Sequence, residues 1–199
     1  MIVRLDQQLL VYLNSFNSPF WDQVMFAISG RFIWIPLYLA IMIYLGITYK
    51  RKFLVILLFI ILGITIADQT SVNLFKNLIQ RLRPCHEPAL QGLIHLVNGD
   101  CGGKYGFISS HATNSFFVAQ FSLLFIRKRW FTIFIILWAA VIGYSRIYLG
   151  VHYPGDVICG AIVGTLIGWG VYELYVLTDN IILKKKEYFN PLMNQPPLL

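Results

Sequence analysis

Residues capable of catalysis are concentrated in the stretch 145–156, which carries Arg146, His152 and Asp156. His152 and Asp156 are four residues apart, so one helical turn or a tight turn at the intervening Pro-Gly would bring the imidazole and the carboxylate together. An imidazole oriented by a carboxylate can act as a nucleophile or as a proton shuttle. The stretch therefore predicts one of these two roles for His152.

A second cluster could bind an anion. Lys76 and Arg83 are seven residues apart, which would place both on one face of a helix that Pro84 ends. Two cations at one helix end suit an anion with several oxygens, and Arg engages phosphate through two donors. The alternative interpretation is a pair of interfacial cations that extend toward lipid headgroups.

The segment 107–111 predicts the start of another helix. Ser109 is expected to cap it, with Ser110 and His111 in the first turn. The exposed N–H groups of a helix N-terminus bind anions, and His111 would face the same site. The alternative for His111 is a capping or interfacial histidine.

Composition places these clusters in a membrane protein. Of 199 residues, 57% are hydrophobic and 13% charged, against about 45–50% and about 25% in soluble proteins, and the mean hydropathy is +0.66. The net charge of +7 could suggest nucleic acid as a partner. However, the basic triplets at 50–52, 127–129 and 184–186 each follow an apolar run, as at cytoplasmic ends of membrane helices, so no nucleic-acid partner is expected.

The apolar runs predict an all-α polytopic membrane bundle with about five transmembrane helices. The expected spans are 32–49, 53–82, 111–126, 130–148 and 157–177. Residues 1–16 and 21–29 are expected to form short interfacial helices, and insertion of this N-terminal part would add a sixth span. Residues 1–183 form one domain with its core motifs at 76–156, followed at 184–199 by a basic, then proline-containing cytoplasmic tail that we expect to be disordered.

The basic triplets also predict the topology. We expect the protein to lie in the inner cell membrane. All three triplets and the C-terminus would then face the cytoplasm. The loops 83–110 and 145–156 then both lie on the non-cytoplasmic face, periplasmic or extracellular. Three cations and a helix N-terminus meeting there indicate a phosphate or similar oxyanion, and two histidines with one carboxylate indicate nucleophilic attack with general acid catalysis. These clusters contain no cysteine–histidine spacing of a metal site.

Together the three clusters resemble the motifs of the type 2 phosphatidic acid phosphatase superfamily. The patterns Lys-x6-Arg-Pro and Ser-Arg-x5-His-x3-Asp are matched in full, at Lys76, Arg83, Pro84, Ser145, Arg146, His152 and Asp156. The middle pattern, Pro-Ser-Gly-His, is matched only at Ser109 and His111, because Ile108 and Ser110 replace its proline and glycine. The similarity covers about residues 68–160.

The resemblance implies a metal-independent phosphatase, without a cofactor, for a lipid phosphate or diphosphate such as phosphatidic acid, phosphatidylglycerol phosphate, undecaprenyl diphosphate or lipid A phosphate. In this family His152 would attack phosphorus and become a phosphohistidine, Asp156 would hold its other ring nitrogen, and His111 would protonate the leaving oxygen. The remaining matched positions would bind the phosphate: Lys76, Arg83, Ser109, Ser110 and Arg146.

Two alternative functions stay open. The same site could pass the phosphoryl group from His152 to an acceptor other than water, as a lipid phosphotransferase. A carrier or lipid-handling membrane protein could use the cations for binding alone. A haem protein is excluded, because His111 and His152 lie at span ends beside cations. These patterns specify neither the lipid nor the oligomeric state.

Cys85 and Cys101 flank the outer loop. In an oxidising compartment they could form a disulfide worth ~3 kcal/mol on the chain-entropy model. Two free thiols are the alternative.

Small residues recur on the fifth expected span at Gly160, Gly164 and Gly168. Such a stripe favours close helix packing, either within one chain or between two. Asp68, in the second span, is expected to be a structural partner for a nearby polar group rather than a participant in the reaction.

Overall fold

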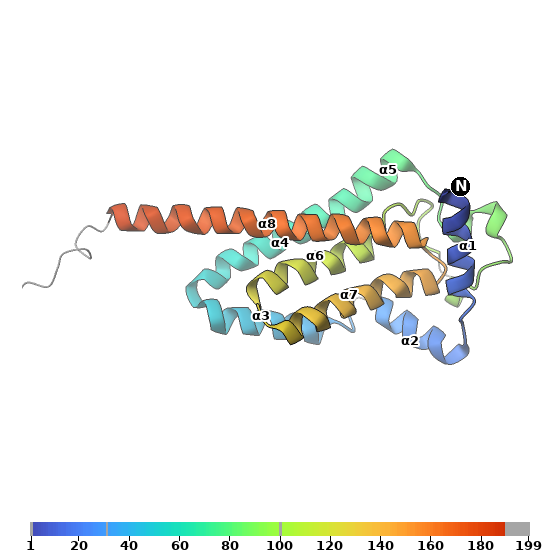
Figure 1. The fold of residues 1–199 in the computed structure, drawn as a ribbon, viewed down its shortest axis with the longest axis horizontal. Helices are drawn as coiled ribbons and strands as arrows, with labels where there is room; N and C mark the ends of the chain where they lie inside the picture. The colour runs from blue at the N-terminus through green and yellow to red at the C-terminus, as the bar shows by residue number, and fades with distance from the viewer. Residues whose placement is uncertain (1, 31, 100, 190–199) are drawn as a thin grey trace, which may run out of the picture.

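The computed structural model describes residues 2–30, 32–99 and 101–189 (Figure 1). Its α-helices are α1 (Ile2–Asn14), α2 (Pro19–Ser29), α3 (Ile35–Tyr49), α4 (Phe53–Gln69), α5 (Lys76–Ile79), α6 (Ser110–Phe125), α7 (Arg129–Tyr148) and α8 (Pro154–Phe189). A π-helix (Thr70–Phe75) joins α4 to α5, and short 3-10 turns lie at Lys50–Lys52, Pro84–His86, Pro88–Leu90 and Val97–Gly99. No strand occurs in these ranges, in agreement with the all-α prediction. The part of the expected tail at 190–199 lies outside the described residues.

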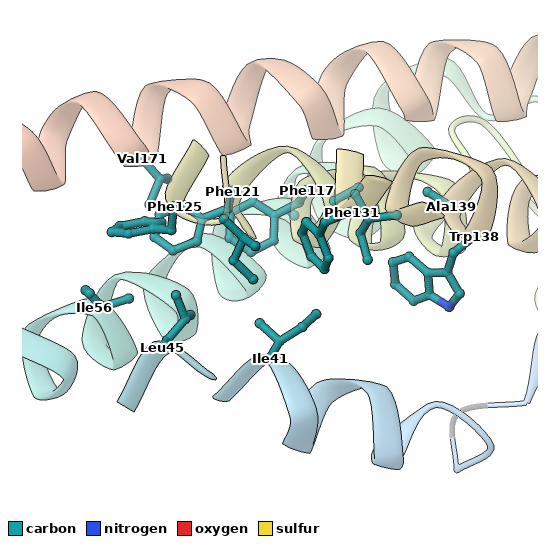
Figure 2. Close-up of a cluster of buried hydrophobic side chains, with 14 of the residues drawn as sticks. Ile41, Leu45, Ile56, Phe117, Phe121, Phe125, Phe131, Trp138, Ala139 and Val171 are labelled. Carbon is teal, nitrogen blue, oxygen red and sulfur yellow. The ribbon is translucent and has the colours of Figure 1, made fainter. Parts of the chain in front are cut away.

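The core is built around α6, which packs against α4, α7 and α8. Phe117, Phe121 and Phe125 recur every four residues, so they form one buried row along the helix. Figure 2 shows this row facing side chains of α3 and α4, among them Leu45. Gly63 of α4 makes the approach possible, because a Cβ at this position would overlap the ring of Phe117.

The glycine stripe of α8 lies against α6. A Cβ at Gly164 would overlap the carbonyl oxygen of Thr113, and a Cβ at Gly160 would lie 2.8 Å from the carbonyl oxygen of Ser109. The stripe therefore serves packing within one chain. The close approach also joins the starts of the two helices, since the N–H of Ser109 donates to the carbonyl of Asp156 at 3.0 Å.

Three helical stretches are long and apolar enough to cross a membrane: Ile35–Ile79, Arg129–Tyr148 and Pro154–Ile181. The first of these stretches turns back at Lys50–Lys52, so it consists of two helices, α3 and α4 (Figure 1). With α6 they correspond to the five expected spans, although the number that crosses the bilayer stays a prediction.

The outer surface of the bundle has the composition of a lipid-facing surface. Leu54, Leu137 and Leu166 are 68%, 59% and 57% exposed, and they belong to three different helices. Soluble proteins rarely expose such extended apolar surface. The protein is thus an integral membrane protein, as predicted.

The two ends of the bundle differ in chemistry. At one end α1 lies across the long helices (Figure 1). At the other end Lys52 pairs with Asp179 at 2.8 Å, and Arg127 donates to the hydroxyl of Tyr172 at 2.9 Å. Because both partners belong to α8, two of the basic segments predicted to be cytoplasmic share this end.

The second expected span ends earlier than predicted. Helix α5 stops at Ile79 because Gln80 adopts a left-handed conformation with φ of +50°. The chain then extends, and the N–H of Arg83 donates to the carbonyl of Lys104 at 3.0 Å. The predictions that Pro84 ends this helix, and that Lys76 and Arg83 share one helical face, were therefore wrong, because pairing with the next loop replaces the last helical turn.

Candidate active site

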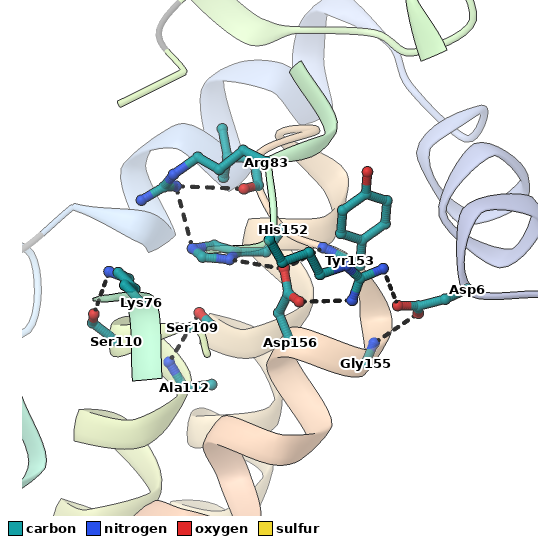
Figure 3. Close-up of polar contacts among 12 residues, drawn as sticks. Asp6, Lys76, Arg83, Ser109, Ser110, Ala112, His152, Tyr153, Gly155 and Asp156 are labelled. Atoms are coloured by element: carbon teal, nitrogen blue, oxygen red, sulfur yellow. Dashed lines mark hydrogen bonds and ion pairs between the residues drawn. The ribbon is translucent and has the colours of Figure 1, made fainter. Parts of the chain in front are cut away.

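The predicted histidine–carboxylate pair is present at the α1 end of the bundle (Figure 3). Pro154 occupies the first position of α8, where its fixed φ favours helix initiation, and Asp156 lies in the first turn. Nδ1 of His152 lies 3.3 Å from Oδ2 of Asp156, and both side chains are buried. The same oxygen accepts the N–H of Tyr153 at 3.1 Å. The start of α8 therefore fixes the carboxylate against the imidazole.

The second ring nitrogen of His152 faces a cation. Nε2 lies 3.3 Å from Nη1 of Arg83 (Figure 3). Burial lowers the pKa of His152 well below its usual 6.5, and the charges of Arg83, Arg146 and Lys76 lower it further. The imidazole is thus neutral at pH 7. A proton on Nδ1, directed at Asp156, leaves the lone pair of Nε2 on the Arg83 side, as a nucleophile requires.

The start of α6 gathers further phosphate-binding candidates. Ser109 caps the helix, since its Oγ accepts the N–H of Ala112 at 3.5 Å. Nζ of Lys76 donates to Oγ of Ser110 at 2.9 Å (Figure 3), and Ser71 of the π-helix donates to the same oxygen at 2.9 Å. Lys76 is therefore held beside a helix N-terminus, where N–H groups and a cation together attract anions.

A cavity of about 280 Å³ brings other predicted residues together, because Arg83, His111 and Arg146 all line it. The guanidinium of Arg146 donates to Oγ of Ser29 at the end of α2. Ser29 also lines the cavity, so α2 helps to position one phosphate-binding candidate. An oxyanion in this cavity would meet two guanidinium groups and the imidazole of His111.

Two residues that the sequence interpretation missed, Arg81 and Asp6, link Asp156 to α1. Arg81 donates through Nη1 to Oδ1 of Asp156 at 2.9 Å and through Nη2 to Oδ2 of Asp6 at 2.7 Å. Asp6 belongs to α1 and also accepts the N–H of Gly155 at 2.8 Å (Figure 3). The guanidinium of Arg81 covers the ring of Tyr153, 3.7 Å from its centroid. Both oxygens of the Asp156 carboxylate are therefore occupied.

The error about α5 explains why Arg81 was overlooked. In a continuous helix Arg81 would point away from Lys76 and Arg83. In an extended segment, residues two apart share one side, so Arg81 and Arg83 both reach the pair of His152 and Asp156. A prediction of extended backbone from Gln80 onward would have identified Arg81 as a residue of the candidate site. Nothing in the sequence indicated that Asp6 contacts Arg81.

The loop before α6 is closed by a disulfide between Cys85 and Cys101, whose Cα atoms lie 6.1 Å apart. Of the two alternatives that the sequence left open, free thiols or a disulfide, this structure has the disulfide. Together with His86, these cysteines form the one group of three potential metal ligands in the described part of the chain, with ligand atoms within 4.8 Å. Because the sulfurs are bonded to each other, the group offers no thiolate to a metal.

The profile of the PAP2 superfamily matches residues 53–178, a range that includes every predicted catalytic and phosphate-binding residue. The chain belongs to the PAP2 superfamily. This membership confirms the predicted family and the expectation of a phosphatase.

Relatives of this PAP2 protein carry specific names. A lipid A 4′-phosphatase of Bacteroides thetaiotaomicron is 45% identical over 170 residues, which cover 84% of this chain and 76% of the relative. A lipid A 4′-phosphatase of Porphyromonas gingivalis is 35% identical, over 88% of this chain and 75% of the relative.

Two crystal structures share the PAP2 fold. LpxE of Aquifex aeolicus has a TM-score of 0.61 and 25% identity, covering 83% of this chain and 93% of its own. The PAP2-type phosphatidylglycerolphosphate phosphatase of Bacillus subtilis has a TM-score of 0.66 and 23% identity, over 91% of this chain and 87% of its own. The second likeness supports the fold alone.

Proposed function

We propose that this PAP2 phosphatase hydrolyses a lipid-borne phosphate through a phosphohistidine on His152. The observation that carries the proposal is the buried imidazole, with Nδ1 3.3 Å from Oδ2 of Asp156 and Nε2 3.3 Å from Nη1 of Arg83. Nε2 attacks phosphorus, the bond between phosphorus and the leaving oxygen breaks, and His111 donates a proton to that oxygen. Water then attacks the phosphohistidine while His111 takes its proton, so inorganic phosphate leaves and both histidines regain their first state.

The charge that builds on the phosphate oxygens is stabilised by the surrounding donors. Arg83 and Arg146 line the cavity next to the nucleophile, and Lys76 lies at the start of α6. The side chain of Ser110 and the backbone N–H groups that follow Ser109 in the first turn of α6 complete this set of donors. Preorganised donors of this kind can supply most of a phosphatase's transition-state stabilisation without a metal.

The preferred substrate is a phosphate monoester on lipid A. Both named relatives are lipid A 4′-phosphatases, and one of them is 45% identical over most of this chain. The exposed apolar surface of the bundle favours a position of the protein in the bilayer, so a lipid substrate can reach the polar residues without leaving the membrane. Phosphatidic acid, phosphatidylglycerol phosphate and undecaprenyl diphosphate are the comparison substrates.

The proposed location is the inner membrane, with the site on the non-cytoplasmic face. Lys52 and Arg127 support this orientation, because basic residues mark cytoplasmic helix ends and both lie at the end of the bundle away from α1. The disulfide between Cys85 and Cys101 supports it as well, because such bonds persist in oxidising compartments.

The test is phosphate release from lipid A by detergent-purified protein in the presence of EDTA. His152→Ala should abolish release, while protection of the variant by orthovanadate, a phosphate analogue, in a thermal melt should persist. During turnover of phosphate-labelled lipid, the wild-type protein should carry an acid-labile, base-stable label, as expected of a phosphohistidine, and His152→Ala should carry none. Turnover of the variant at the wild-type rate would refute the assignment of the nucleophile, and transfer of the label to a second lipid would indicate a phosphotransferase.

A further inference from the structure

A second, larger cavity adjoins the cavity that Arg83, His111 and Arg146 line. It has a volume of about 520 Å³ and lies among residues of α2, α3, α4 and α6. Ser29, Gly30 and His111 line both cavities. His111 therefore stands at the junction between them.

The position of His111 gives the larger cavity a role in the proposed phosphatase reaction. The inference therefore rests on the proposed function. The general acid must face the oxygen that leaves with the rest of the substrate. Because His111 is that acid and borders the larger cavity, the group that carries the phosphate occupies this cavity. Its walls should then match the chemistry of that group.

The walls offer hydrogen-bond acceptors. Asp68 of α4 and Asn114 of α6 line the cavity, and the Nδ2 of Asn114 donates to Oδ1 of Asp68 at 3.5 Å. Oδ1 of Asn114 is buried and has no hydrogen-bond partner among the described residues. A buried polar atom without a partner is costly, so this oxygen fits a ligand that brings a donor. Hydroxyl groups supply such donors.

Aromatic side chains form another part of the wall. Trp34 and Tyr38 at the start of α3 line the same cavity. A wall that combines flat apolar rings with a carboxylate and an amide suits a sugar, which has apolar faces and hydroxyl edges. A second phosphate is disfavoured, because the carboxylate of Asp68 would repel it.

The cavity also continues toward an apolar one. Tyr38, Ile64 and Asn114 line both the larger cavity and a third of about 390 Å³, which descends among the apolar residues of α3, α4 and α6. Its wall includes Phe117 and Phe121 of the α6 row. Polar walls near His111 followed by apolar walls deeper in the bundle match a sugar that bears acyl chains.

We propose that Asp68 and Asn114 form a subsite for the hydroxyl groups of the phosphate-bearing sugar and select it over a diphosphate. This assigns Asp68 a part in substrate selection, whereas the sequence favoured a structural role alone. Asp68→Asn keeps the shape of the side chain and removes its charge. Asn114→Ala removes the buried acceptor.

The test compares phosphate release from lipid A and from undecaprenyl diphosphate in one detergent. Asp68→Asn and Asn114→Ala should each lower kcat/KM for lipid A about 10- to 100-fold. For the diphosphate, Asp68→Asn should leave kcat/KM unchanged or raise it. The competitive inhibition constant of inorganic phosphate should change less than about twofold in both variants, which shows that the folded phosphate site is intact. Asp179→Asn, the same change at the opposite end of the bundle, is the matched control.

The outcomes separate the two proposals. If the wild type releases no phosphate from any of the lipids, the proposed function fails. If the wild type acts on lipid A but both variants retain its kcat/KM, or lose it in parallel with their affinity for inorganic phosphate, the subsite is refuted while the phosphatase stands.

Discussion

Replacing Arg81 by Met tests whether the contact between α1 and the catalytic carboxylate supports the reaction. The change keeps the apolar length of the side chain and removes both donors, so Oδ1 of Asp156 loses the partner that now lies at 2.9 Å. Asp156 is 0% exposed, and removing one partner of a buried ion pair costs about 3–5 kcal/mol. Because 22% of the Arg81 side chain is exposed, water reaches the gap, and we expect a loss of about 2–3 kcal/mol in the free energy of unfolding.

The catalytic effect should fall on kcat. A carboxylate without its second partner can rotate away from Nδ1 of His152, and residues that orient a functional group typically contribute about 10- to 100-fold in activity. KM should change little, because Arg81 does not line the cavity in which Arg83, Arg146 and His111 would meet the phosphate. Asp6→Asn should give a smaller loss, since Arg81 then retains its bond to Asp156.

The assay is steady-state phosphate release from lipid A combined with thermal melting in detergent. Arg127→Met is the matched control, because Arg127 donates to Tyr172 at the opposite end of the bundle. Arg81→Lys, which keeps one charge, should recover part of kcat. An Arg81→Met variant with wild-type kcat, or one whose KM alone rises, would refute a positioning role.

Two further predictions concern pH and packing. In Arg83→Gln, the loss of a charge that lowers the pKa of His152 should raise that pKa, so the acid limb of kcat/KM should move to higher pH than in the wild type. The ionisation of the substrate is common to both proteins, so an acid limb at the same pH in both would contradict this role of Arg83. Gly164→Ala should lower the melting temperature in detergent, with about 1–3 kcal/mol lost to overpacking against the backbone of α6. Gly170→Ala is its control, because an added Cβ there meets nothing within 4 Å, and equal melting temperatures of the two variants would show that the stripe does not pack as described.

Local patterns were enough to predict most of the helices and the proximity of His152 and Asp156 in the candidate site. Apolar runs that end in basic triplets predicted the long helices, because both features follow directly from the bilayer. Ser109 was predicted as a cap because capping depends on residues within one turn. His152 and Asp156 were predicted as neighbours because their spacing alone brings them together.

What the sequence could not predict depends on contacts between distant segments. Nothing near Gln80 announces a left-handed residue, since pairing with the loop at 104–106 decides where the helix ends. In the sequence, Asp6 is one polar position on an amphipathic helix, and only the folded structure brings Arg81 into contact with it. Ser29 likewise gains its role only when α2 packs against α7 and meets Arg146.

The contact between Asp6 and Gly155 also bears on how the protein is assembled. It joins the first described helix to the last across 149 residues, so it can form only after the chain has been made as far as α8. Bringing such distant segments together is entropically costly and belongs to the late steps of folding. Phosphatase activity should therefore appear after the bundle has become resistant to proteolysis, as the final event in its maturation.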